Sequence, residues 1–152
     1  MTSIFTAPDM NKRRVFARQK KAVIERARGC CEYCRSPMRY ATQTFSIEHI
    51  IPQHRGGKST LTNLALACQG CNNHKFTKIV ALDPARGKMA PLYHPRKQRW
   101  YEHFTWIHDG TFVVGLTPTG RATVEALDLN REGLLNIRQL LCEKGEHPPD
   151  ES

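Results

Sequence analysis

Two short cysteine motifs enclose the stretch that decides the fold: residues 31–34 read Cys-Glu-Tyr-Cys, and residues 68–71 read Cys-Gln-Gly-Cys. Each motif places two thiols on one side of a tight turn, and two such turns complete the tetrahedral four-thiolate sphere of a structural zinc site. Cys30 competes for the register of the first motif, but its spacing to Cys34 is one residue longer than usual. The sequence therefore predicts Zn²⁺ held by Cys31, Cys34, Cys68 and Cys71.

The chain between and after these motifs predicts two strands and a helix. Residues 44–51 alternate apolar and polar side chains, which indicates a short strand that ends at Pro52 and the Arg55-Gly56-Gly57 turn. Residues 61–67 are an apolar run that fits a return strand or a helical turn. Residues 72–80 lack a helix breaker and predict a helix with asparagine as its N-cap. We therefore expect an α+β fold.

Polar residues of the same stretch predict a second metal site. A zinc ion held by both motifs is expected to bring the strand over 44–51 against the following helix. Glu48 and His49 would then share a cleft with Asn63 and Asn72. Glu48 and Asn72 offer oxygen donors suited to Mg²⁺ or Mn²⁺, and His49 can accept a proton from water near neutral pH. Taken singly, each residue also fits an ordinary structural role.

The ordered set from residue 31 to residue 75 resembles the HNH endonucleases, a family with a ββα-metal fold and, in one branch, a four-cysteine zinc clamp. The resemblance implies that His49 is the general base, that Glu48 and Asn72 hold the catalytic metal, and that Asn63 orients the base. His74 is the alternative metal ligand, because some branches use a histidine of the final helix. The residues that carry the resemblance are Cys31, Cys34, Glu48-His49-Ile50-Ile51-Pro52, Arg55-Gly56-Gly57, Asn63-Leu64 and Cys68-Gln69-Gly70-Cys71-Asn72-Asn73-His74-Lys75.

The implied activity is hydrolysis of phosphodiester bonds, in which water activated by His49 attacks phosphorus and the products carry 5′ phosphates. DNA is the implied partner, with RNA as an alternative, and Arg55 and Lys75 are candidate phosphate contacts. The competing class is a zinc-dependent nucleic-acid-binding module without cleavage activity. A redox protein is a weaker hypothesis, because no thioredoxin-like βαβ pattern surrounds either cysteine pair.

Charge is concentrated in the first half of this 152-residue chain of formal charge +9. Residues 1–80 carry 14 basic and four acidic side chains, whereas residues 81–152 carry nine and ten. Such an excess favours a polyanionic partner, because basic side chains that neutralise phosphates release condensed counterions. Residues 11–28 predict a basic amphipathic helix ending at Gly29, either solvated or contacting nucleic acid through Lys20, Lys21 and Arg28.

The chain divides into a basic N-terminal helix (1–29), a nuclease core (30–82) and a C-terminal extension (83–152). In the extension we expect a connector over 83–95, a short helix over 98–104, a hairpin around Asp109-Gly110, and a frayed tail from residue 145. Two further helices are predicted over 119–127 and over 130–142, the second capped by Asn130 and containing Cys142 as a packed thiol. Trp100, Phe104, Trp106, Phe112 and Leu116 are expected to build a small satellite core.

Parts of the extension between residues 91 and 131 resemble the tail of bacterial, notably cyanobacterial, HNH proteins, which implies no particular substrate. No apolar run approaches the roughly 18–20 residues of a membrane span, and no signal-peptide pattern opens the chain. A cytoplasmic protein without a membrane partner is expected.

Overall fold

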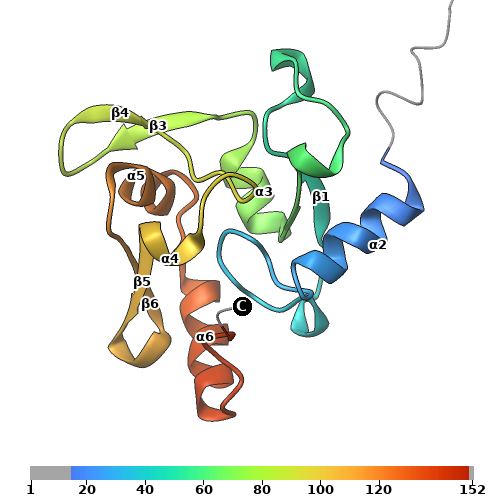
Figure 1. Cartoon of the computed structure of the whole chain (residues 1–152). Coiled ribbons are helices and arrows are strands. Elements are labelled where there is room, and N and C mark those ends of the chain that lie inside the picture. The colour runs from blue at the N-terminus through green and yellow to red at the C-terminus, as the bar shows by residue number, and fades with distance from the viewer. Residues whose placement is uncertain (1–14, 151–152) are drawn as a thin grey trace, which may run out of the picture.

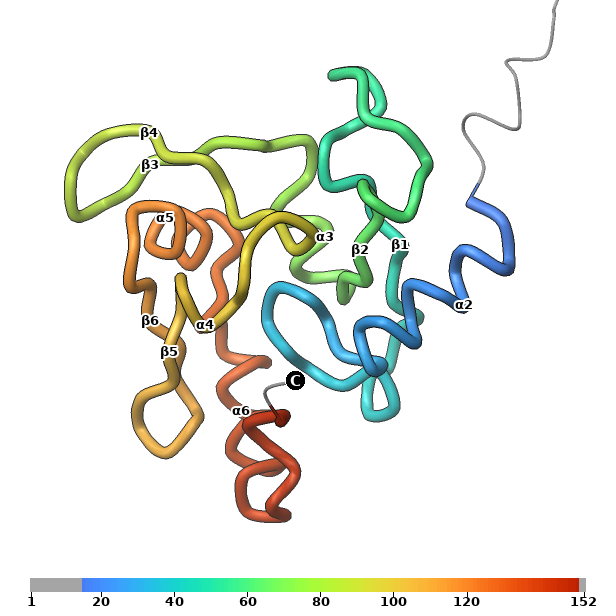
Figure 2. Tube along the Cα trace, in the orientation of Figure 1, coloured from blue at the N-terminus to red at the C-terminus, as the bar shows by residue number. Residues whose placement is uncertain are grey.

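Three antiparallel two-stranded hairpins and five α-helices make up the described part of the chain, residues 15–150 of a computed structural model (Figure 1). The predicted helix over 11–28 is α2 at Ala17–Arg26, and residues 11–14 lie outside the described part. Figure 2 follows the trace from α2 through the loop that carries the first cysteine pair to the strands and helix at the centre of the molecule. The α+β class is confirmed.

The centre is a ββα unit formed by β1 (Ser46–His49), β2 (Leu64–Ala67) and α3 (Gln69–Lys75). The strands pair in antiparallel register, with Ser46 opposite Ala67 and His49 opposite Leu64. The ambiguous run over 61–67 contains both predicted elements, because a 3₁₀ turn at Leu61–Asn63 leads directly into β2. All four β2 residues are buried, since β2 lies between its partner strand and α2.

Helix α3 begins earlier and ends earlier than predicted. Cys68 is its N-cap, and the Cys68 sulfur accepts a hydrogen bond from the Cys71 amide at 3.4 Å. Asn72 therefore lies inside the helix, and the prediction of an asparagine N-cap is wrong. The helix stops at Lys75 because Phe76 adopts a positive φ of 51°. The helix predicted over 72–80 thus ends five residues early, and its last predicted residue, Val80, begins a strand over Val80–Asp83.

The expected connector over 83–95 contains a strand, which is a second correction. β3 (Val80–Asp83) pairs with β4 (Lys88–Pro91), and α5 (Pro118–Ala126) packs on this hairpin. Buried Asp83 accepts two hydrogen bonds from the Arg121 guanidinium, at 2.9 and 2.8 Å. The hairpin depends on this contact with a helix more than thirty residues away, so local sequence patterns did not reveal it.

The secondary structure of residues 98–143 follows the prediction closely, with two local differences. α4 spans Trp100–His103, β5 (Phe104–Ile107) pairs with β6 (Phe112–Gly115), and α6 spans Glu132–Glu143. The hairpin loop is wider than a two-residue turn, because a 3₁₀ turn occupies His108–Gly110. Asn130 does not cap α6. Its side-chain oxygen accepts a hydrogen bond from the Val113 amide at 2.9 Å, and its side-chain nitrogen donates to the Val113 carbonyl oxygen at 2.8 Å.

One hydrophobic core joins all three predicted segments. Trp100 and Phe104 belong to the same buried cluster as Val23 of α2 and the cysteine motifs, whereas Leu116 is exposed, so the expected satellite core is wrong. The predicted frayed tail is also packed as far as it is described. His147 is buried with its Nε2 atom 2.9 Å from the Gly110 carbonyl oxygen. Among residues 15–150, none of the helices combines the length and the hydrophobicity that a bilayer-spanning segment requires.

A matched pair of glycine substitutions tests how α5 is docked. A Cβ atom at Gly120 meets the His103 carbonyl oxygen at 2.0 Å, whereas one at Gly133 of α6 meets nothing within 4 Å. Gly120→Ala is therefore expected to lower the free energy of unfolding by about 1–3 kcal/mol through overpacking. Gly133→Ala is expected to raise it by about 0.5–1 kcal/mol, because alanine is the better helix former. Urea unfolding measures both, and equal effects would contradict the observed docking.

Candidate active site and metal centre

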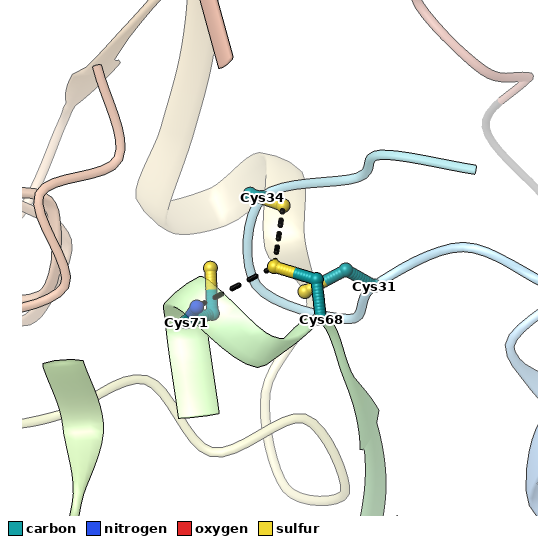
Figure 3. Close-up of side chains that lie close together, drawn as sticks. All are labelled: Cys31, Cys34, Cys68 and Cys71. Atoms are coloured by element: carbon teal, nitrogen blue, oxygen red, sulfur yellow. Dashed lines mark hydrogen bonds between the residues drawn. The ribbon is translucent and has the colours of Figure 1, made fainter. Parts of the chain in front are cut away.

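Four buried cysteines converge on one point beside the start of α3. The sulfur atoms of Cys31, Cys34, Cys68 and Cys71 all lie within 4.8 Å of one another and point toward a common centre (Figure 3). The Cys34 and Cys68 sulfur atoms are 3.7 Å apart. Four soft thiolates on two turns match the closed tetrahedral environment that zinc prefers, so the residues present fit a structural zinc ion.

The remaining cysteines are not part of this cluster. Cys30 pairs through its backbone with Pro37, and the Cys142 sulfur lies 3.3 Å from the Asp109 carbonyl oxygen. The register of the first motif is thereby settled in favour of Cys31. Burial raises the pKa of the Cys31 thiol, so a bound cation is the natural means of stabilising its thiolate form.

The guanidinium of Arg131 is a contact of this cluster that the sequence did not suggest. One of its nitrogen atoms lies 3.4 Å from the Cys68 sulfur and 3.7 Å from the Cys71 sulfur. Gly70 lies directly under this group, since a Cβ atom at Gly70 meets an Arg131 nitrogen at 2.4 Å. The C-terminal extension therefore supplies a positive charge to sulfur atoms that carry negative charge when they bind a metal.

Glu32, inside the first cysteine motif, is a second residue that sequence reasoning missed. It is buried, its carboxylate accepts a hydrogen bond from the Leu66 amide at 2.8 Å, and it forms an ion pair with Arg96. The Glu32 amide in turn donates to the Leu66 carbonyl oxygen at 2.9 Å. The motif is thus bound to β2 on one side and to the extension on the other.

A surface groove brings together three of the residues that the sequence singled out. Glu48 and His49 from the end of β1 and Asn72 from α3 all line it, as the resemblance implied. His74 does not line this groove and lines a separate hollow beside α5, so Asn72, and not His74, shares the groove with His49. The groove is lined by Ser46, Ile47, Glu48, His49, Pro52, Gln53, His54, Asn72, Phe76 and Thr77.

The His49 ring is held by a serine. Its Nε2 atom lies 2.8 Å from the Ser59 hydroxyl oxygen, and the Ser59 carbonyl oxygen accepts a hydrogen bond from Gln19 of α2 at 2.9 Å. Partial burial lowers the pKa of His49, which favours the neutral imidazole at neutral pH. A neutral, oriented imidazole can accept a proton from water. Ser59 carries no motif signal and was not foreseen.

Glu48 lies at the buried edge of the groove within a polar network. Its carboxylate accepts a hydrogen bond from the Tyr33 hydroxyl and pairs with the Lys75 ammonium at 3.3 Å. Burial raises the pKa of Glu48, while Lys75 and Tyr33 act in the opposite direction. Each carboxylate oxygen has two lone pairs, so these contacts leave acceptor capacity for a cation.

Lys75 is therefore not the phosphate contact that we expected. Its side chain is 1% exposed, and the ammonium also donates to the Ile50 carbonyl oxygen at 2.9 Å. A lysine with its charge enclosed in this way cannot meet a phosphate at the surface without breaking both contacts. Lys75 lies one turn after Asn72 on α3, and its ion pair with Glu48 instead ties β1 to this helix.

Asn63 also makes contacts that differ from the prediction. We expected its side-chain oxygen to hold the imidazole of His49, but that oxygen accepts a hydrogen bond from the Ile51 amide at 2.9 Å. Its amide nitrogen donates to the carbonyl oxygens of Ile51 and Lys58, at 3.0 and 2.9 Å. Asn63 thus shapes the loop between the strands and reaches His49 only through that loop.

The predicted basic contacts lie outside the groove. Lys20, Lys21 and Arg28 are exposed on and after α2, and Arg55 is exposed in the 3₁₀ turn at Gln53–Arg55. Arg26, which the sequence did not distinguish, donates to the carbonyl oxygens of Leu61 and Leu64 at 2.8 and 2.7 Å. Arg26 therefore docks α2 against the end of the loop and the start of β2. Lys20, Lys21 and Arg28 remain candidate contacts for a polyanion.

Comparison with known families agrees with this geometry. Residues 31–78 match the family model described as HNH endonuclease, a range that contains the four cysteines, β1, β2 and α3. No curated protein and no solved structure matches the chain. The resemblance inferred from the sequence is therefore confirmed for residues 31–78, which are similar to the HNH endonuclease family.

The role observed for Asn63 leads to a stability prediction. Asn63→Ala removes three hydrogen bonds from a buried side chain and is expected to lower the free energy of unfolding by about 2–4 kcal/mol. Asn73→Ala, at an exposed asparagine of α3, is the matched control and should change it by less than about 0.5 kcal/mol. Denaturant melts of the two variants make the comparison. Equal stability of both variants would show that Asn63 does not support the loop.

Proposed function

We propose that this protein is a metal-dependent endonuclease that hydrolyses phosphodiester bonds of DNA. The observation that carries the proposal is the groove in which Glu48, His49 and Asn72 meet, within a segment that matches the HNH endonuclease family. HNH domains act on nucleic acids, and the basic excess of residues 1–80 supports a polyanionic substrate.

In the proposed reaction, His49 is the general base. When Nε2 donates a hydrogen bond to Ser59, the lone pair of the ring lies on Nδ1, and that atom accepts the proton of the attacking water. Ser59 thereby takes the orienting role expected of Asn63, and Asn63 acts by shaping the loop that carries Ser59. The water oxygen attacks phosphorus, the bond to the 3′ oxygen breaks, and the product keeps a 5′ phosphate.

Glu48 and Asn72 are the residues that would hold a divalent ion, Mg²⁺ or Mn²⁺, through their side-chain oxygens. Such an ion, when bound, stabilises negative charge on the phosphorane and on the departing oxygen. Lys75 and Tyr33 keep the Glu48 carboxylate in place at the edge of the groove. In this proposal the end of β1 supplies the carboxylate of Glu48 and the base His49, and α3 supplies Asn72. The cysteine cluster holds these two elements together.

One observation favours the alternative of a binding module without cleavage. Both carboxylate oxygens of Glu48 already have a partner, one in Tyr33 and one in Lys75. If Lys75 occupies the place of the divalent ion, the groove still binds phosphates but does not cleave them. Cleavage and binding assays on the same protein separate the two functions.

Plasmid cleavage tests the assigned base and the choice of metal ligand. Supercoiled plasmid is incubated with the protein and Mg²⁺, Mn²⁺ or no added metal, and nicked products are tested for ligation, which requires a 5′ phosphate. His49→Ala should reduce the rate by roughly 10²–10⁴-fold. Asn72→Ala should also reduce it, whereas His74→Ala, outside the groove, should not. Equal nicking by wild type and His49→Ala contradicts the base, and binding without cleavage supports the alternative.

The cysteine cluster predicts a zinc requirement for folding. Elemental analysis of the purified protein should find one zinc ion per chain, because a four-thiolate site binds one zinc ion. The Cys31→Ser/Cys68→Ser variant should lose both the metal and the cooperative thermal transition, since binding and folding are coupled. Cys30→Ser/Cys142→Ser, which leaves the cluster intact, is the control and should keep both. A folded, zinc-free Cys31→Ser/Cys68→Ser protein would falsify the assignment.

A further inference from the structure

Helix α3 ends in a turn whose backbone conformation is unusual for the residue that occupies it. Phe76 has φ 51° and ψ −119°, and the Lys78 amide donates to the Lys75 carbonyl oxygen at 3.0 Å. These values describe the first central position of a type II′ turn, which glycine strongly prefers. A bulky aromatic residue is strained there, because its Cβ atom crowds the backbone.

Within residues 15–150, the side chain of Phe76 makes little contact that would offset this strain. It is 72% exposed, more than Met89 at 62%, and it contributes little to the hydrophobic core. Within residues 15–150, no aromatic ring or cationic group stacks on it. The other exposed aromatic side chains differ in this respect, since Tyr40 stacks with Arg39, and Phe16 stacks with Arg18.

The position of Phe76 suggests which external group meets the ring. Phe76 follows Asn72 by one helical turn, and both line the groove that contains His49. A phosphate bound between His49 and Asn72 carries its nucleoside within reach of the groove wall, and every nucleobase offers a flat face to an aromatic ring. The turn fixes the direction of the Cα–Cβ bond of Phe76, and the exposed ring offers its face to such stacking.

We propose that Phe76 stacks on a nucleobase next to the phosphate in the groove, and that the preferred substrate has an unstacked base at this position. The inference rests on the proposed function, because it places a nucleic acid in the groove. In a continuous duplex both faces of each base are covered by its neighbours, so the ring can bind only after a base step opens. Single strands, flaps and mismatched sites offer a free face without that penalty.

Binding without cleavage tests the inference independently of catalysis. All proteins carry His49→Ala, no divalent ion is added, and fluorescence anisotropy follows binding of a labelled single strand and of a blunt duplex of the same sequence. Phe76→Gly should weaken single-strand binding by about 5- to 150-fold, the range known for the loss of one base–aromatic stack. Phe76→Trp should retain the affinity, and Met89→Ala, at an exposed apolar residue outside the groove, should not change it.

A thermal melt excludes a merely structural effect. Phe76→Gly places the preferred residue in the turn and should not lower the melting temperature, so a loss of affinity in a protein of undiminished stability supports stacking. Unchanged single-strand affinity in Phe76→Gly overturns the inference and leaves plasmid cleavage as the separate test of function. An equal loss for single strand and duplex also overturns it. If the His49→Ala protein binds no nucleic acid, the inference fails together with the proposed function.

Discussion

The convergence of four cysteine sulfur atoms is the constraint on which the rest of the structure depends. Strands β1 and β2 have four residues each and α3 has seven, and elements this short bury too little surface to hold themselves together. The cluster fixes the loop at residues 31–34 against the first turn of α3, at the end of the hairpin. A metal bound there would add free energy of folding that these short elements do not supply by themselves.

The same loop also positions the groove. Between its two cysteines lie Glu32, which bonds the backbone of β2, and Tyr33, whose hydroxyl donates to the Glu48 carboxylate. Opening of the cysteine cluster would therefore displace Tyr33, the partner of Glu48, together with the loop. Lys75 completes the network from α3, so the carboxylate of the strand is held by both elements that the cysteines bring together.

The C-terminal extension packs around the cysteine cluster, and several of its arginines make contacts in the interior. Arg96 pairs with Glu32, Arg131 lies on the cysteine sulfur atoms, and Trp100 donates to the Tyr33 carbonyl oxygen at 2.9 Å. Arg138 is buried and donates to the Leu129 carbonyl oxygen at 2.6 Å. These arginines contact groups in the interior, so the formal charge of the chain overstates the charge available to a polyanionic partner. The basic residues exposed on α2 are part of the charge that remains available.

The sequence by itself determined the cysteine cluster, because spacing within a short motif fixes which side chains a turn presents. The resemblance of residues 31–75 to the HNH endonucleases added the ββα core and the gathering of Glu48, His49 and Asn72 in one groove. The sequence also located the hairpin at residues 104–115, whose turn is a local signal. Only the tertiary structure decided that Lys75 is buried against Glu48, that Ser59 rather than Asn63 holds His49, and that residues 80–91 form a hairpin. Each of these depends on partners distant in the chain, and neither periodicity nor spacing encodes which distant group a polar side chain will meet.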